Sequence, residues 1–92
     1  MSIKSYKDAI NEALLQEMKK DENVVIMGED VAGGAGTNGE QDAWGGVLGV
    51  TKGLLGHYGR ERVIDTPITE TAILGMASGA ALTGLRPVAE LM

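Results

Sequence analysis

The chain has 92 residues, of which 43% are hydrophobic, so it can bury one small core but not two independent ones. Its net charge of −5, from 13 acidic and 8 basic residues, argues against a nucleic-acid partner, because phosphate backbones require a basic surface. Without cysteine it cannot form disulfides or thiolate metal sites, and without an apolar run of roughly 20 residues it offers no membrane span, so a soluble, cytoplasmic protein is expected.

An amphipathic helix is predicted over Ser5–Lys20, because apolar side chains recur there at helical spacing and Ser5 is a suitable N-cap. The next apolar run, Val24–Met27, is rich in β-branched residues and apolar on both faces. That pattern is typical of a buried parallel strand, which here ends at Gly28.

A long loop is predicted next, because Gly28–Gly46 holds seven of the 14 glycines and shows neither helical nor strand periodicity. Loops of this length within a small domain are usually functional or mobile. A second helix is expected over Val47–Tyr58, where apolar residues recur at helical spacing although several glycines weaken it.

A second strand, a third helix and a third strand complete the pattern. The strand is predicted at Arg62–Thr66 and stops at Pro67, which lacks the N–H that a central strand donates. The helix is expected over Glu70–Thr83, and because its residues are almost all small or aliphatic, it should be buried on all sides. Gly84 is the expected C-terminal cap, and Arg86-Pro87 starts the last strand, which continues through Val88–Met92.

This order of elements is typical of an open α/β fold, in which a mostly parallel sheet carries helices on both faces. Gly75 and Gly79 lie one turn apart and would allow another backbone to approach the third helix closely. Because the pattern stops within the third strand, we expect residues 1–92 to be the first part of a longer protein.

Gly34–Gly39 matches the G-x-G-x-x-G pattern of dinucleotide-binding loops. That pattern binds phosphates where it joins a strand directly to a helix, yet five residues separate it from Gly28 and no periodic helix follows it. A glycine-rich loop without nucleotide is therefore favoured. The alternative that the chain is a noncatalytic module, which binds a nucleotide or another protein, stays open.

The segment Asp65–Glu70 places a carboxylate in the first turn of an apolar helix, directly beyond a strand end. Helix capping by Thr69 and Glu70 would explain the position of this carboxylate without a catalytic or binding role. A carboxylate on an apolar helix is, however, costly to desolvate unless a partner accepts its charge, which makes Glu70 a candidate functional residue. Glu29 and Asp30 also follow a strand end, where open α/β sheets bind ligands, although solvated loop acids are the alternative.

Four segments, in this order and spacing, carry a resemblance to a known family: Gly28–Val31, Thr51–Leu54, Arg62–Glu70 and Ala81–Val88. Together they resemble the β subunits of the thiamine-diphosphate-dependent 2-oxo acid dehydrogenases, over nearly the whole chain. Within that family, Gly33–Leu54 is most similar to the acetoin dehydrogenase branch.

The resemblance implies a transketolase-like, pyrimidine-binding domain, of which residues 1–92 are the N-terminal part, the rest of the domain and a C-terminal domain being absent from this chain. In such a family the cofactor, thiamine diphosphate, lies between the α and β subunits of an α2β2 heterotetramer. The α subunit holds the magnesium ion, so this chain would bind no metal itself and would be inactive alone.

The resemblance also implies roles for individual residues. Glu70 falls on the catalytic glutamate that hydrogen-bonds N1′ of the aminopyrimidine, and this chemistry needs an acid held away from water. Ile68 and Thr69 would line the pyrimidine pocket, and Glu29 would belong to an acidic, water-filled path between active sites. The expected reaction cleaves acetoin and passes an acetyl group to a lipoyl-bearing acyltransferase; pyruvate or a branched-chain 2-oxo acid is the alternative substrate.

Overall fold

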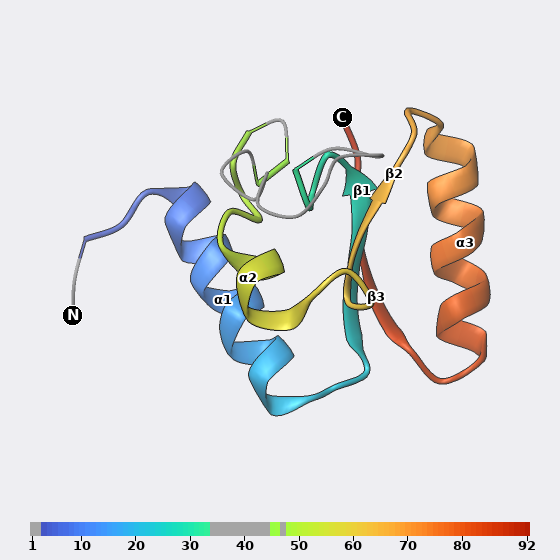
Figure 1. Cartoon of the computed structure of the whole chain (residues 1–92), viewed down its shortest axis with the longest axis horizontal. Helices are drawn as coiled ribbons and strands as arrows, with labels where there is room; N and C mark the ends of the chain where they lie inside the picture. The colour runs from blue at the N-terminus through green and yellow to red at the C-terminus, as the bar shows by residue number, and fades with distance from the viewer. Residues whose placement is uncertain (1–2, 34–44, 47) are drawn as a thin grey trace.

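The computed structural model describes residues 3–33, 45–46 and 48–92, which form a small α/β fold (Figure 1). Its elements in chain order are α1 (Tyr6–Lys20), β1 (Val24–Glu29), α2 (Leu54–Tyr58), β2 (Val63–Thr66), α3 (Glu70–Leu82) and β3 (Arg86–Glu90). The three strands form one parallel sheet in the order β2-β1-β3. The predicted parallel sheet is therefore confirmed, with β1 at its centre.

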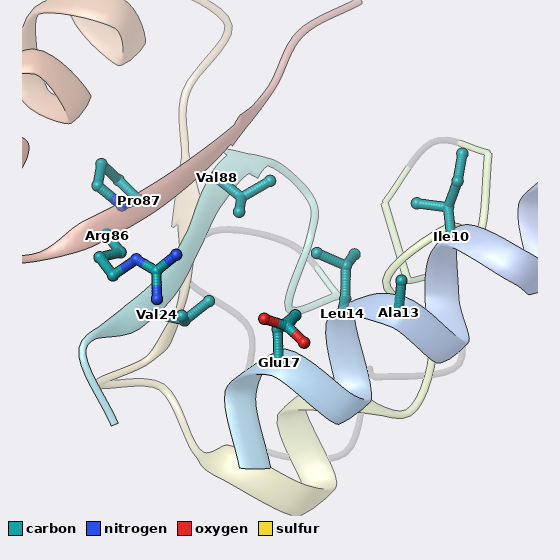
Figure 2. Close-up of a pocket in the computed structure, with 8 residues that line it drawn as sticks. All are labelled: Ile10, Ala13, Leu14, Glu17, Val24, Arg86, Pro87 and Val88. Atoms are coloured by element: carbon teal, nitrogen blue, oxygen red, sulfur yellow. The ribbon is translucent and has the colours of Figure 1, made fainter. Parts of the chain in front are cut away.

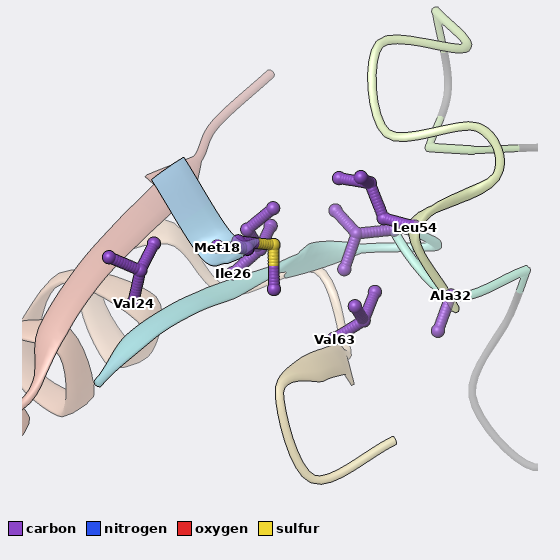
Figure 3. Close-up of a cluster of buried hydrophobic side chains, with 7 residues drawn as sticks. Met18, Val24, Ile26, Ala32, Leu54 and Val63 are labelled. Atoms are coloured by element: carbon purple, nitrogen blue, oxygen red, sulfur yellow. The ribbon is translucent and has the colours of Figure 1, made fainter. Parts of the chain in front are cut away.

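The side chains of β1 alternate between the two faces of the sheet and build two separate clusters. The cluster beneath α1 and α2 consists of Met18, Val24, Ile26, Val31, Ala32, Leu54 and Val63 (Figure 3). On the opposite face, Val25 and Met27 pack against Ile73 of α3. Helices thus cover both faces of the sheet, as the apolar run of β1 predicts.

The first helix and its exit are held by polar contacts. The Ser5 side chain accepts a hydrogen bond from the Asp8 N–H at 3.1 Å, as the predicted N-cap should. At the other end, Arg62 Nη2 donates to the carbonyl oxygens of Met18 at 2.7 Å and Asp21 at 2.9 Å. The same guanidinium lies over the Tyr58 ring, 4.7 Å from its centroid. Arg62 therefore ties the end of α1 to the entrance of β2.

The second helix begins at Leu54, so the predicted start at Val47 is wrong. Gly49 and Gly53 have φ values of 76° and 90°, in the left-handed region that a continuous right-handed helix excludes. Asn11 of α1 holds this turn instead, because its Nδ2 donates to the Val50 and Lys52 carbonyl oxygens at 2.7 and 2.9 Å. The last strand begins at Arg86, as predicted, but ends at Glu90 and not at Met92.

From its composition we expected the third helix to be buried on all sides. The structure leaves most of it exposed. Ile73 is its buried residue, whereas Leu74 is 49% exposed and Leu82 is 89% exposed. The described chain packs only one side of α3 against the sheet, so most of its apolar surface is left open (Figure 1). In the described parts of the chain, no helix is both long and apolar enough to cross a membrane.

Candidate functional site

The predicted site residues gather at the carboxyl edge of the sheet. Glu29, the last residue of β1, is paired in register with Thr66, the last residue of β2. Only three residues separate Thr66 from Glu70, where α3 begins. The strand end that carries Glu29 and the helix start that carries Glu70 therefore lie at the same edge, where open α/β folds bind ligands (Figure 1).

Glu70 stands at the first position of α3, after Thr69 as the N-cap residue. Thr69 occupies the cap position that the sequence predicts, but its side chain makes no capping hydrogen bond. Ile68, Thr69 and Glu70 are all exposed, with Ile68 at 67%. The described residues therefore do not provide the expected enclosure of Glu70 away from water, because none of them covers the open side of the helix start.

A cavity of about 220 Å³ lies beside this helix start. It is lined by Ile64, Asp65, Thr66, Pro67, Thr69, Ala72, Ile73 and Met76. Of the four predicted cofactor-binding residues, Thr69 lines this cavity, whereas Glu29, Ile68 and Glu70 do not. The sequence reasoning did not single out Thr66, which is 7% exposed and whose hydroxyl has no hydrogen-bond partner among the described residues.

A larger cavity of about 380 Å³ lies between α1 and β3, on the other face of the sheet (Figure 2). It is lined by apolar residues of α1, by Val24 of β1 and by the first three residues of β3, with Glu17 and Arg86 as the charged members. None of the predicted site residues lines it. It is therefore separate from the helix start that carries Glu70.

Glu90 is an acidic residue that the sequence reasoning did not identify. Its Oε2 atom is buried with no hydrogen-bond partner in the described structure, and a Cβ built on Gly46 would lie 2.6 Å from that oxygen. Burial, followed by the negative charges of Glu29 and Asp30, raises the pKa of Glu90. The signal in the sequence was an acid within an otherwise apolar strand.

The loop after β1 is anchored at Asp30. This residue has a left-handed backbone (φ 57°), and its carbonyl oxygen accepts hydrogen bonds from the N–H groups of Gly33 at 3.0 Å and Gly46 at 2.7 Å. The G-x-G-x-x-G segment, Gly34–Gly39, lies outside the described residues, so its interpretation stays a prediction. Within the described parts, no group of three or more His, Asp or Glu side chains could hold a metal ion.

Comparison with known proteins identifies relatives over almost the full chain. The family model described as the pyrimidine-binding domain of transketolase matches residues 3–92. The β subunits of the acetoin:2,6-dichlorophenolindophenol oxidoreductases of Bacillus subtilis and Cupriavidus necator are 63% and 60% identical, each over 96% of this chain. The 2-oxoisovalerate dehydrogenase β subunit of Bacillus subtilis is 47% identical over 99% of the chain. The alignments cover 25–26% of these relatives, so the chain spans about a quarter of their length.

Proposed function

Because the chain belongs to the family of transketolase pyrimidine-binding domains, we propose that it forms the N-terminal part of the β subunit of a thiamine-diphosphate-dependent acetoin dehydrogenase. Identity of 60–63% to two acetoin oxidoreductase β subunits, against 47% to the 2-oxoisovalerate relative, supports acetoin as the substrate. The reaction would cleave the C–C bond of acetoin, release acetaldehyde and pass the remaining two-carbon unit as acetyl to a lipoyl-bearing acyltransferase, whose lipoyl disulfide is reduced as that unit is oxidised.

The observation that carries the proposal is the carboxylate of Glu70, exposed at the start of α3, two residues after the exposed apolar residue Ile68. This pair fits a heteroaromatic ring that has a nitrogen at its edge, because the ring packs on the apolar group and the nitrogen bonds to the carboxyl. When bound, thiamine diphosphate supplies the carbon nucleophile that adds to the substrate carbonyl. Glu70 would hold or move the proton at N1′ of the aminopyrimidine, while Ile68 and Thr69 contact the ring and Glu29 adds negative charge nearby.

The open side of α3 supports a second proposal, that an α subunit covers the site. A Cβ built on Gly75 or Gly79 meets nothing within 4 Å, so another helix could approach the backbone of α3 closely there. Such a partner would exclude water from Glu70, which this chain leaves exposed. We expect an α2β2 heterotetramer in the cytoplasm, with the α subunit holding magnesium and the diphosphate, and no activity from this chain alone.

The test compares wild type with Glu70→Gln in the full-length β subunit assembled with its α partner. Thiamine-diphosphate-dependent dye reduction is measured with acetoin, pyruvate and 2-oxoisovalerate as separate substrates. We expect acetoin to be preferred and Glu70→Gln to lower turnover by at least about 100-fold, since a general acid–base group contributes that much. Glu61→Gln, at an exposed acid outside the site, is the matched control and should retain turnover.

Three outcomes would contradict parts of this proposal. Preference for pyruvate or 2-oxoisovalerate keeps the family chemistry but rejects acetoin. Retained turnover in an intact Glu70→Gln complex rejects the role of Glu70. Nucleotide binding that survives Glu70→Gln but is lost when Gly34 and Gly36 are replaced, without any turnover of the three substrates, favours the binding module instead.

A further inference from the structure

Asp65 has a buried carboxylate that joins two segments far apart in the sequence. Its side chain is 5% exposed, and its Oδ1 accepts a hydrogen bond of 2.6 Å from the N–H of Ala32. Its Oδ2 lies 3.5 Å from Nη1 of Arg60, whose side chain is 40% exposed. The carboxylate therefore bonds on one side to the turn after β1 and on the other to the segment before β2.

The geometry of Gly28 permits this contact. Asp65 is paired in register with Gly28, and a Cβ built on that glycine would lie 2.8 Å from the Glu90 carbonyl oxygen and 3.1 Å from a Val31 methyl group. Because glycine has no side chain, the turn after β1 can fold back over the strand and bring Ala32 to Asp65. Val31 and Ala32 are fully buried, so the turn that Asp65 holds is packed on the core.

The turn that Asp65 holds and the strand that contains Asp65 each lie close in sequence to one of the two acids of the proposed cofactor site. Ala32 lies three residues after Glu29, and Asp65 lies five residues before Glu70. Between Asp65 and Glu70, Thr66 is buried and Pro67 has a fixed φ, so a shift of the β2 end would be passed on to the helix start. A charged carboxylate accepts a stronger hydrogen bond from a backbone N–H than a neutral acceptor does. The bond from Ala32 to Asp65 is therefore suited to holding the two strand ends in a fixed geometry.

We propose that Asp65 is a positioning residue. By linking the carboxyl end of β1 to that of β2, it fixes the positions of Glu29 and Glu70 relative to each other. This inference rests on the proposed function, since it assigns Asp65 a role in holding thiamine diphosphate. In this role Asp65 acts on the backbone and not on the reacting groups. It acts through its hydrogen bond to Ala32, and the ion pair with the more exposed Arg60 is secondary.

The test measures the Kd of thiamine diphosphate by calorimetry, and kcat at saturating cofactor, in the full-length β subunit assembled with its α partner. We expect Asp65→Ala to raise Kd and to lower kcat, each by about tenfold or more, because small misplacements of site residues are costly. Asp65→Asn, which keeps an oxygen that can accept from Ala32, should recover most of both losses. Arg60→Met, which removes the ion pair to Asp65, should leave Kd and kcat within about threefold of wild type.

Several results would overturn the proposal. One is wild-type Kd and kcat in Asp65→Ala, and another is a lower melting temperature with unchanged kcat at saturation, which marks a purely structural role. A loss in Arg60→Met equal to that in Asp65→Ala would assign the effect to the ion pair instead. Should Asp65→Ala fail to assemble, Asp65→Glu decides, because its extra methylene displaces the turn while keeping the charge. Wild-type Kd in that variant rejects the proposal, and a raised Kd supports it.

The failure of this inference is distinguishable from the failure of the proposed function. If the assembled wild-type complex binds no thiamine diphosphate, the proposed function itself is wrong. If wild type binds the cofactor and Glu70→Gln loses turnover, while Asp65→Ala behaves as wild type, only the role of Asp65 is rejected.

Discussion

Asp65 and Glu90 lie on either side of Gly28, in one row of residues across the parallel sheet. The two carboxylates have opposite surroundings. Asp65 accepts a hydrogen bond from Ala32 and faces Arg60, whereas Oε2 of Glu90 is buried without a partner in the described structure. One edge of the sheet therefore holds a satisfied acid and an unsatisfied one.

Glu90 is predicted to make stability depend on pH. Burial and the charges of Glu29 and Asp30 raise its pKa in the folded protein above 4.5, its ordinary value. The folded state therefore keeps this proton when the unfolded chain has already lost it, so the free energy of unfolding falls as pH rises from 4.5 through the raised pKa. Glu90→Gln, which is neutral at every pH, should remove this loss and be more stable than wild type at pH above the raised value.

Denaturant unfolding of the full-length subunit between about pH 4 and 8 measures this effect. Glu61→Gln, which removes an exposed acid, is the control and should keep the wild-type pH dependence. A Glu90→Gln curve parallel to that of wild type would show that Glu90 is not responsible.

Arg62 is predicted to be the most costly single cation to remove from the described fold. Its guanidinium donates to the Met18, Asp21 and Val24 carbonyl oxygens and lies over the Tyr58 ring. Arg62→Met would leave three carbonyl groups, at the end of α1 and at the start of β1, without this donor, so we expect a loss of about 2–4 kcal/mol in the free energy of unfolding. Lys20→Met is the control, because its salt bridge to Glu17 is exposed and should contribute less than about 1 kcal/mol. Equal effects of the two substitutions would contradict this assignment.

The sequence predicts the sheet well because its signals are local. The apolar run of β1 and the helical spacing of α1 each depend on residues that neighbour one another along the chain or on one helix face. The start of α2 was misplaced because helical spacing also occurs in the turn before it. There, left-handed glycines and the distant Asn11 decide the backbone conformation.

The site is predicted only in part, for a related reason. Glu70 and Glu29 are candidates because they follow strand ends, which a linear sequence reveals. The contact of Asp65 with Ala32 and the isolation of Glu90 beside Gly46 depend on segments that meet only after folding. Glu70 is exposed among the described residues, because the composition of α3 indicates that this helix must be covered but does not show which segment or partner covers it.

Gly28 is predicted to be intolerant of a side chain. A Cβ there would lie 2.8 Å from the backbone oxygen of Glu90, which cannot move without disturbing the pairing of β1 with β3. Gly28→Ala should therefore lower the free energy of unfolding by about 1–3 kcal/mol.

Gly56→Ala is the matched control, because a Cβ at this position in α2 meets nothing within 4 Å. It should be neutral or stabilising by up to about 1 kcal/mol, since alanine favours a helix. Denaturant unfolding of both variants decides, and equal destabilisation would rule out the steric explanation.

Gly75 is predicted to separate the stability of the subunit from its assembly. A Cβ at this position meets nothing in the described structure, and glycine within a helix costs about 1 kcal/mol relative to alanine, so Gly75→Ala should stabilise the isolated full-length subunit. If a partner helix packs on this side of α3, the same methyl group must weaken association, because it holds the two backbones apart.

Titration of the labelled β subunit with its α partner measures this association, and we expect its Kd to rise about tenfold, equivalent to about 1.4 kcal/mol. Gly56→Ala, which gains the same helical preference on α2, should not change that Kd. Unchanged association in Gly75→Ala, with the expected gain in stability, would place the α subunit elsewhere on the surface.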